Sequence, residues 1–87
     1  MKVSLTEVVN IFDGLISGEL SREDASDWAK KRQEAEDAGD LEYEPATKER
    51  EIWDAVLYLE GVDLKDSPDT YLHISDDFRD YKNRLST

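Results

Sequence analysis

The side chains that most often carry enzyme chemistry are sparse in this sequence. Its single histidine, His73, stands between Leu72 and Ile74 and beside Tyr71, without an obvious relay partner. A nucleophilic triad depends on a histidine held by an acid and placed against a hydroxyl or thiol. We therefore interpret His73 as a loop or interface residue and not as a catalytic base.

Metal binding is only weakly indicated. Asp63, Asp66 and Asp69 are spaced three residues apart and resemble a carboxylate cluster. An EF-hand calcium loop needs acids at alternate positions, a glycine at the sixth position and a final glutamate, and Pro68 does not fit that pattern. The absence of cysteine also excludes thiolate metal sites, disulfides and cysteine nucleophiles. We expect neither a metal nor a cofactor.

Other enzyme signatures are missing or uninformative. Paired carboxylates can hydrolyse glycosides, but with 22 acids in 87 residues some pair is always present. The four glycines lie within or at the ends of predicted helices, so no glycine-rich loop is available to cradle a phosphate. The sequence does not predict an enzyme.

The distribution of charge is more informative. Eleven Lys and Arg against 22 Asp and Glu give a net charge of −11 and a pI near 4.3. Residues 34–44 hold six acids and no base, and residues 54–80 hold eight acids against Lys65 and Arg79. Because phosphate contacts need clustered Lys and Arg, this balance argues against direct binding of nucleic acid or of an anionic membrane. The acids form either a solvated face or a docking surface for a basic partner.

Apolar side chains recur at helical spacing over residues 5–17, 22–38 and 45–60, and Ser75 caps a last short helix with Phe78, Tyr81 and Leu85 facing inward. Ser4 and Glu7 form a capping-box pattern at the start of the first stretch. Gly14 interrupts that helix at a cost of about 1 kcal/mol, which we interpret as room for close helix packing. Pro45 is assigned to the first turn of the third helix, where its missing N–H costs nothing. Residues 62–74 lose the helical period and predict a long acidic loop.

The pattern predicts an all-α protein, an antiparallel four-helix bundle with a long acidic loop between helices three and four, formed by one domain over residues 1–87. The first residues lack the apolar segment of a signal peptide. No apolar run approaches the roughly 20 residues of a membrane span. We expect a cytoplasmic protein that does not contact a membrane.

The layout resembles one family of small acidic helical proteins. The resemblance rests on Leu5–Phe12, the Gly18–Glu23 turn, the charged Trp28–Arg32 segment and the helix Ile52–Glu60. These segments are similar in order and character to the colicin D-type immunity proteins, the bacterial self-protective colicin-like immunity family. The resemblance implies a four-helix bundle that binds a tRNA-cleaving toxin domain and covers its active site with acids.

The residues that match the acidic surface of that family follow the third helix and begin the fourth. They are Glu60, Asp63, Asp66, Asp69, Asp76 and Asp77, to which Tyr71 is added as an aromatic interface anchor. The hypothesis is an immunity protein that neutralises a basic toxin nuclease domain, as a monomer or in a 1:1 complex. The alternative hypothesis is an acidic nucleic-acid mimic or a regulatory protein-binding adaptor.

Overall fold

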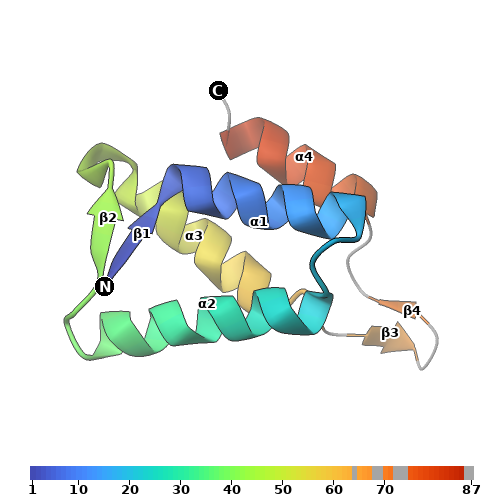
Figure 1. Cartoon of the computed structure of the whole chain (residues 1–87), viewed down its shortest axis with the longest axis horizontal. Coiled ribbons are helices and arrows are strands. Elements are labelled where there is room, and N and C mark those ends of the chain that lie inside the picture. The colour runs from blue at the N-terminus through green and yellow to red at the C-terminus, as the bar shows by residue number, and fades with distance from the viewer. Residues whose placement is uncertain (64, 68–69, 72–74, 86–87) are drawn as a thin grey trace.

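The structure is a computed structural model that describes residues 1–63, 65–67, 70–71 and 75–85 (Figure 1). Its elements, in chain order, are β1 (Lys2–Ser4), α1 (Leu5–Ser17), α2 (Arg22–Asp37), β2 (Glu42–Glu44), a 3-10 turn η1 (Ala46–Lys48), α3 (Glu49–Glu60), β3 (Lys65–Ser67), β4 (Thr70–Tyr71) and α4 (Ser75–Leu85). The four predicted helices are confirmed. The termini of the first two match the prediction to within one residue.

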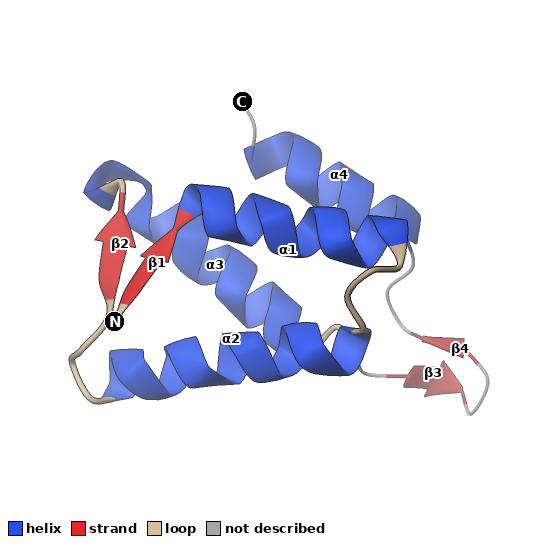
Figure 2. Cartoon of the chain, viewed as in Figure 1, coloured by secondary structure: helices blue, strands red, loops and turns tan. Residues whose placement is uncertain are grey.

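The all-α class is confirmed only in part, because two small sheets accompany the helices (Figure 2). β1 pairs with β2 in parallel, with Val3 opposite Tyr43. β2 lies between the second and third predicted helices, where the sequence predicts only a connection. β3 and β4 form an antiparallel pair within the predicted acidic loop. Strands of two or three residues are too short to show a period-two pattern, so local sequence could not reveal them.

The bundle arrangement is not confirmed. α2 packs chiefly against α3 and α1 against α4, and α3 crosses obliquely between α1 and α2 (Figure 1). Ala25, Ser26 and Ala29 are buried on α2, and these small side chains let α3 approach closely. The Ser26 hydroxyl donates a 2.7 Å hydrogen bond to the Glu60 carbonyl, which satisfies the one buried polar side chain of this contact.

The start of α3 differs from the prediction. Pro45 has an extended backbone (φ −75°, ψ 150°) and precedes η1 instead of standing in the first helical turn. Lys48 is the residue that flanks α3, which begins at Glu49. The helix ends at Glu60, as the sequence predicts. Leu57, predicted to face the core, is 46% exposed.

Local signals place α1 accurately. The Ser4 side chain accepts a 3.0 Å hydrogen bond from the Glu7 amide, and the Glu7 carboxylate accepts one of 3.2 Å from the Ser4 amide. This reciprocal pair satisfies two amides that the helix start would otherwise leave unpaired. Gly18 ends the helix with φ +82°, a conformation that side-chain-bearing residues rarely adopt. A Cβ on Gly14 would lie 2.9 Å from the Cβ of Leu20, so the glycine makes room for the connection between α1 and α2 and not for a neighbouring helix.

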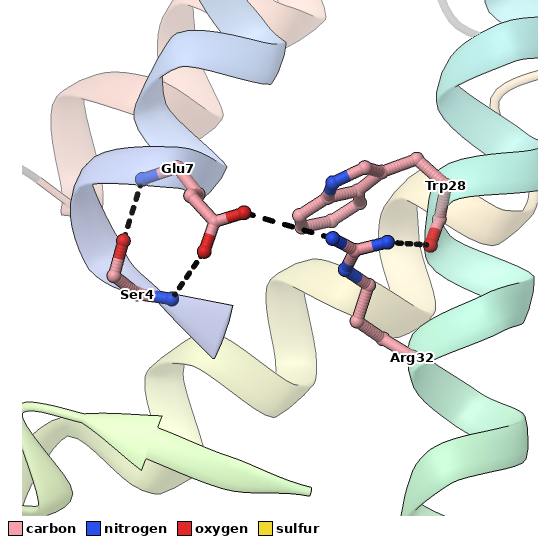
Figure 3. A network of polar contacts seen from close by, with 4 residues as sticks. All are labelled: Ser4, Glu7, Trp28 and Arg32. Atoms are coloured by element: carbon pink, nitrogen blue, oxygen red, sulfur yellow. Dashed lines mark hydrogen bonds and ion pairs between the residues drawn. The ribbon is translucent and has the colours of Figure 1, made fainter. Parts of the chain in front are cut away.

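The same capping glutamate also connects α1 to α2 (Figure 3). A second Glu7 oxygen lies 3.6 Å from the Arg32 guanidinium. Arg32 donates a 3.3 Å hydrogen bond to the Trp28 carbonyl, and its guanidinium lies 4.3 Å from the centre of the Trp28 ring. The Arg32 side chain is only 15% exposed. Its methylene groups are therefore largely buried, and its guanidinium stacks on Trp28 where little water reaches it.

The core is built around Phe12 on α1. Its ring lies 5.2 Å from the Tyr81 ring with an interplanar angle of 15°, and 5.8 Å and 6.5 Å from the rings of Tyr58 and Phe78. Ring separations of 4.5–7 Å add about 0.5–1.5 kcal/mol per pair beyond the burial of area. One side chain of α1 therefore holds both α3 and α4.

Among the helices that the structure describes, none is long and apolar enough to cross a membrane.

We expect Phe12→Ala to lower the free energy of unfolding by about 3–5 kcal/mol, because it leaves a cavity where three aromatic rings meet. Urea titration followed by tryptophan fluorescence measures the change. Leu57→Ala is the control, since its exposed side chain predicts a change below about 0.5 kcal/mol. Equal losses in the two variants would contradict this account of the core.

Arg32→Ala is expected to lower the free energy of unfolding by about 1–2 kcal/mol, since it removes the stacking on Trp28 and the packing of the arginine stem. Lys31→Ala removes an exposed charge from the same helix and should leave stability unchanged within about 0.5 kcal/mol. The same urea titration applies. A neutral Arg32→Ala variant would show that the contact with Trp28 contributes nothing.

Candidate functional site

A hollow of about 350 Å³ lies between α3 and α4. It is lined by Tyr58 from α3 and, from α4, by Asp77, Asp80, Tyr81 and Arg84. A second hollow of about 150 Å³ shares Tyr81 and Arg84 with the first and adds Glu51, Asp54 and Leu85. The two together form one aromatic and acidic surface that contains the Arg84 guanidinium. We call it the α3–α4 hollow.

Helical spacing explains why α4 presents these side chains together. Residues 80 and 81 each lie three or four positions from both 77 and 84, so the four residues lie along one side of the helix. Other residues of α4 fix it to α1: Phe78 is buried, and the Lys82 ammonium pairs with the Asp13 carboxylate at 2.5 Å. The side that lines the hollow lies next to the side that packs on α1, and Tyr81 takes part in both.

The tyrosines of the hollow are in direct contact. The rings of Tyr58 and Tyr81 lie 4.4 Å apart, and Phe12 supports both from the core. The Arg84 guanidinium lies 5.8 Å from the centre of the Tyr81 ring, within the range of a cation–π interaction. These contacts restrict the movement of the two rings, whose outer parts remain partly exposed.

Burial and nearby acids keep both tyrosine hydroxyls protonated. Burial raises the pKa of Tyr58 to about 12, with a further increase from the charge of Asp77 and a partial offset from Arg84. Burial also raises the pKa of Tyr81, assisted by Asp54 and again opposed by Arg84. Both hydroxyls are therefore hydrogen-bond donors over the whole physiological range.

The side chains of the hollow are of kinds that bind polar, planar ligands. It offers flat rings, hydroxyl donors, carboxylate acceptors and one guanidinium, which together can hold a planar polar group. The residues that line it include no histidine. Within the described ranges, no group of three or more His, Cys, Asp or Glu residues is arranged to hold a metal ion.

The structure separates the residues predicted as the binding surface. Asp77 lines the α3–α4 hollow, whereas Asp76, in the same first turn of α4, is exposed and forms a 3.7 Å ion pair with Arg79. Glu60 ends α3, where its carbonyl accepts the Ser26 hydrogen bond, and Asp63 lies in the turn that follows. That these residues form a binding surface stays a prediction.

The remaining predicted residues belong to the β3–β4 segment or lie outside the residues that the structure describes. Asp66 stands in β3, and Tyr71 stands in β4 opposite Lys65. Asp69 and His73 lie outside the described residues.

Of the residues that line the hollow, the predicted binding surface contained only Asp77. It lacked Glu51, Asp54 and Tyr58 of α3 and, on α4, Asp80, Tyr81, Arg84 and Leu85. The signal that could have found those on α4 is the recurrence of aromatic and charged residues along one side of that helix.

Comparison with known proteins decides the family. The model of the family described as YxzC DNA-binding protein matches residues 2–84. The chain belongs to this family. It is 36% identical over 80 residues to the protein named "Uncharacterized protein YxzC" of Bacillus subtilis (strain 168). The match covers 92% of this chain and 60% of the Bacillus protein, so the chain spans well under the full length of that relative. No solved structure matches it.

The YxzC family assignment corrects four expectations. The resemblance to colicin D-type immunity proteins is wrong, and so are the immunity function and the toxin nuclease partner derived from it. The exclusion of direct nucleic-acid contact is contradicted as well, because the family is described as DNA-binding. Small size, acidity and an order of helices are shared by unrelated proteins, so they could not identify a family. The family gives no support to the mimic or adaptor alternative.

The raised pKa of Tyr58 predicts that stability falls as the pH rises from about 10 to about 12. In that range the unfolded chain loses the tyrosine proton while the folded chain retains it, so unfolding becomes more favourable. Below about pH 10 the proton is bound in both states and this contribution to pH dependence disappears. Urea unfolding at several alkaline pH values measures the fall.

Tyr58→Phe separates this residue from the other groups that titrate at alkaline pH. It should show a shallower decline between about pH 10 and 12 than the parent chain. Parallel declines in the two proteins would show that Tyr58 titrates alike in the folded and unfolded states.

Proposed function

We propose that the chain binds DNA and that it does so by holding an unpaired base in the α3–α4 hollow. The observation that supports this most is the pair of contacting tyrosines, Tyr58 and Tyr81, beside the Arg84 guanidinium in one hollow. Aromatic rings and arginine planes are the groups on which proteins stack single-stranded bases. The family description supplies the class of ligand.

The net charge constrains how DNA is bound. A chain with a charge of −11 is repelled by the phosphate backbone, so extended neutralisation of phosphates is disfavoured. Carboxylates line the hollow more densely than cations do. Binding should therefore be short and directed at the base, with Arg84 as the cation beside the adjoining phosphate or base edge.

Base stacking supplies free energy that does not depend on charge. Each base stacked on an aromatic side chain contributes about 1–3 kcal/mol, and the contribution hardly depends on which base is used. A duplex hides the faces of its bases, whereas a single strand exposes them. The proposal thus favours single-stranded over duplex DNA.

Fluorescence anisotropy with a labelled single strand, and with the blunt duplex of the same sequence, tests the proposal. We expect tighter binding of the single strand. With about one phosphate neutralised, raising salt from about 50 to about 200 mM should weaken binding only about threefold, compared with about 1,000-fold or more for proteins that neutralise six or more phosphates. Tighter binding of the duplex, or a steep loss with salt, would refute binding through an unpaired base.

Two charge-matched variants locate the contact. Arg84→Gln removes the cation of the hollow and should weaken binding of the single strand about tenfold, in line with the loss of one charge-assisted contact. Lys31→Gln removes an exposed cation from α2 and should change binding less than twofold. Equal losses would indicate diffuse electrostatic attraction and not a site between α3 and α4.

A further inference from the structure

We infer that the α3–α4 hollow selects guanine among the four bases. The inference rests on the proposed function and names the chemistry that the hollow would recognise. It is carried by the two kinds of charge that line one space, the Arg84 guanidinium and the Asp77 and Asp80 carboxylates, next to the rings of Tyr58 and Tyr81.

The carboxylates determine which base edge is accepted. Aspartate is ionised at neutral pH and can only accept hydrogen bonds, through two oxygens held side by side. Guanine presents two adjacent donors, N1–H and the N2 amino group, on the edge that pairs with cytosine. Thymine has one donor flanked by carbonyl oxygens, which a carboxylate repels. Adenine and cytosine each place an acceptor nitrogen beside their amino group.

Arg84 adds a second criterion that points to the same base. Guanine carries two neighbouring acceptors, O6 and N7, and arginine binds them in a bidentate manner. No other base combines a pair of donors on one edge with a pair of acceptors on the next. A hollow that contains both carboxylates and a guanidinium is complementary to this combination.

The aromatic rings and the size of the space are consistent with a base. Tyr58 and Tyr81 provide apolar surface against which a planar ring can pack. The hollow of about 350 Å³ falls at the small end of ligand sites, which is sufficient for a single base. A phosphate group placed there would face Asp77 and Asp80, so the backbone is expected to stay outside.

The test compares three single strands that differ at one central position. The first is an oligothymidine, the second carries one guanine and the third carries hypoxanthine, which is guanine without the N2 amino group. We expect the guanine strand to bind about tenfold more tightly than the hypoxanthine strand, which loses the bidentate contact with a carboxylate, and more tightly still than the oligothymidine, which also loses the bidentate contact with Arg84. Equal binding of guanine and hypoxanthine would overturn the inference.

A double variant assigns the preference to the hollow. Asp77→Asn with Asp80→Asn replaces carboxylates by amides, which place a donor against a donor of guanine. It should reduce the guanine-to-hypoxanthine ratio to about one. The matched control is Asp27→Asn with Asp37→Asn, which removes two exposed charges from α2 and should keep the ratio at about ten. Using the ratio cancels the general gain in DNA affinity when acids are removed.

The outcomes separate the inference from the proposed function. Binding of all three strands with equal affinity retains single-strand binding and overturns the selection of guanine. No binding of any strand overturns both. A guanine preference that survives in the Asp77→Asn/Asp80→Asn variant, with folding confirmed by circular dichroism, overturns the assignment to this hollow.

Discussion

The packing of aromatic rings around Phe12 is the contact on which the rest of the structure depends. α1 begins at its own capping box, and both α3 and α4 pack against the ring of Phe12 through aromatic side chains, Tyr58 on α3 and Phe78 and Tyr81 on α4. This arrangement has a consequence for the surface. Because Phe12 draws Tyr58 and Tyr81 into contact, the outer parts of the same two rings line the α3–α4 hollow. Stability and the candidate site thus share side chains.

The acidity of the chain disfavours contact with phosphate but not contact with a base. A net charge of −11 is an average over the surface, and it argues against a protein that follows the DNA backbone. It does not argue against contact with a base, since base edges carry donors that carboxylates accept. The composition was used to exclude binding of nucleic acid, and that exclusion failed because it considered only the phosphate groups. The family description and the lining of the hollow are compatible once the base is taken as the group that is bound.

Reasoning from the sequence predicted the ends of α1 but neither the β1–β2 pairing nor the start of α3. The ends of α1 were predicted correctly because capping and the glycine at its end are interactions between residues within a few positions of each other. The pairing of β1 with β2 joins residues about 40 positions apart, and a three-residue strand carries too little pattern to indicate its partner. The start of α3 was misplaced because a proline is compatible both with a first helical turn and with an extended residue before it.

The sequence by itself determined the four helices, the capping of α1, the excess of acid and the absence of cysteine chemistry, since each follows from local spacing or composition. It also contained the recurrence of residues 77, 80, 81 and 84 along one side of α4. Only the tertiary structure decided that this side remains open while Phe78 and Lys82 bind α1, and that Tyr58 of α3 completes the hollow. The physical reason is that helical spacing determines which side chains share a side of the helix. Packing against distant residues determines which side is covered.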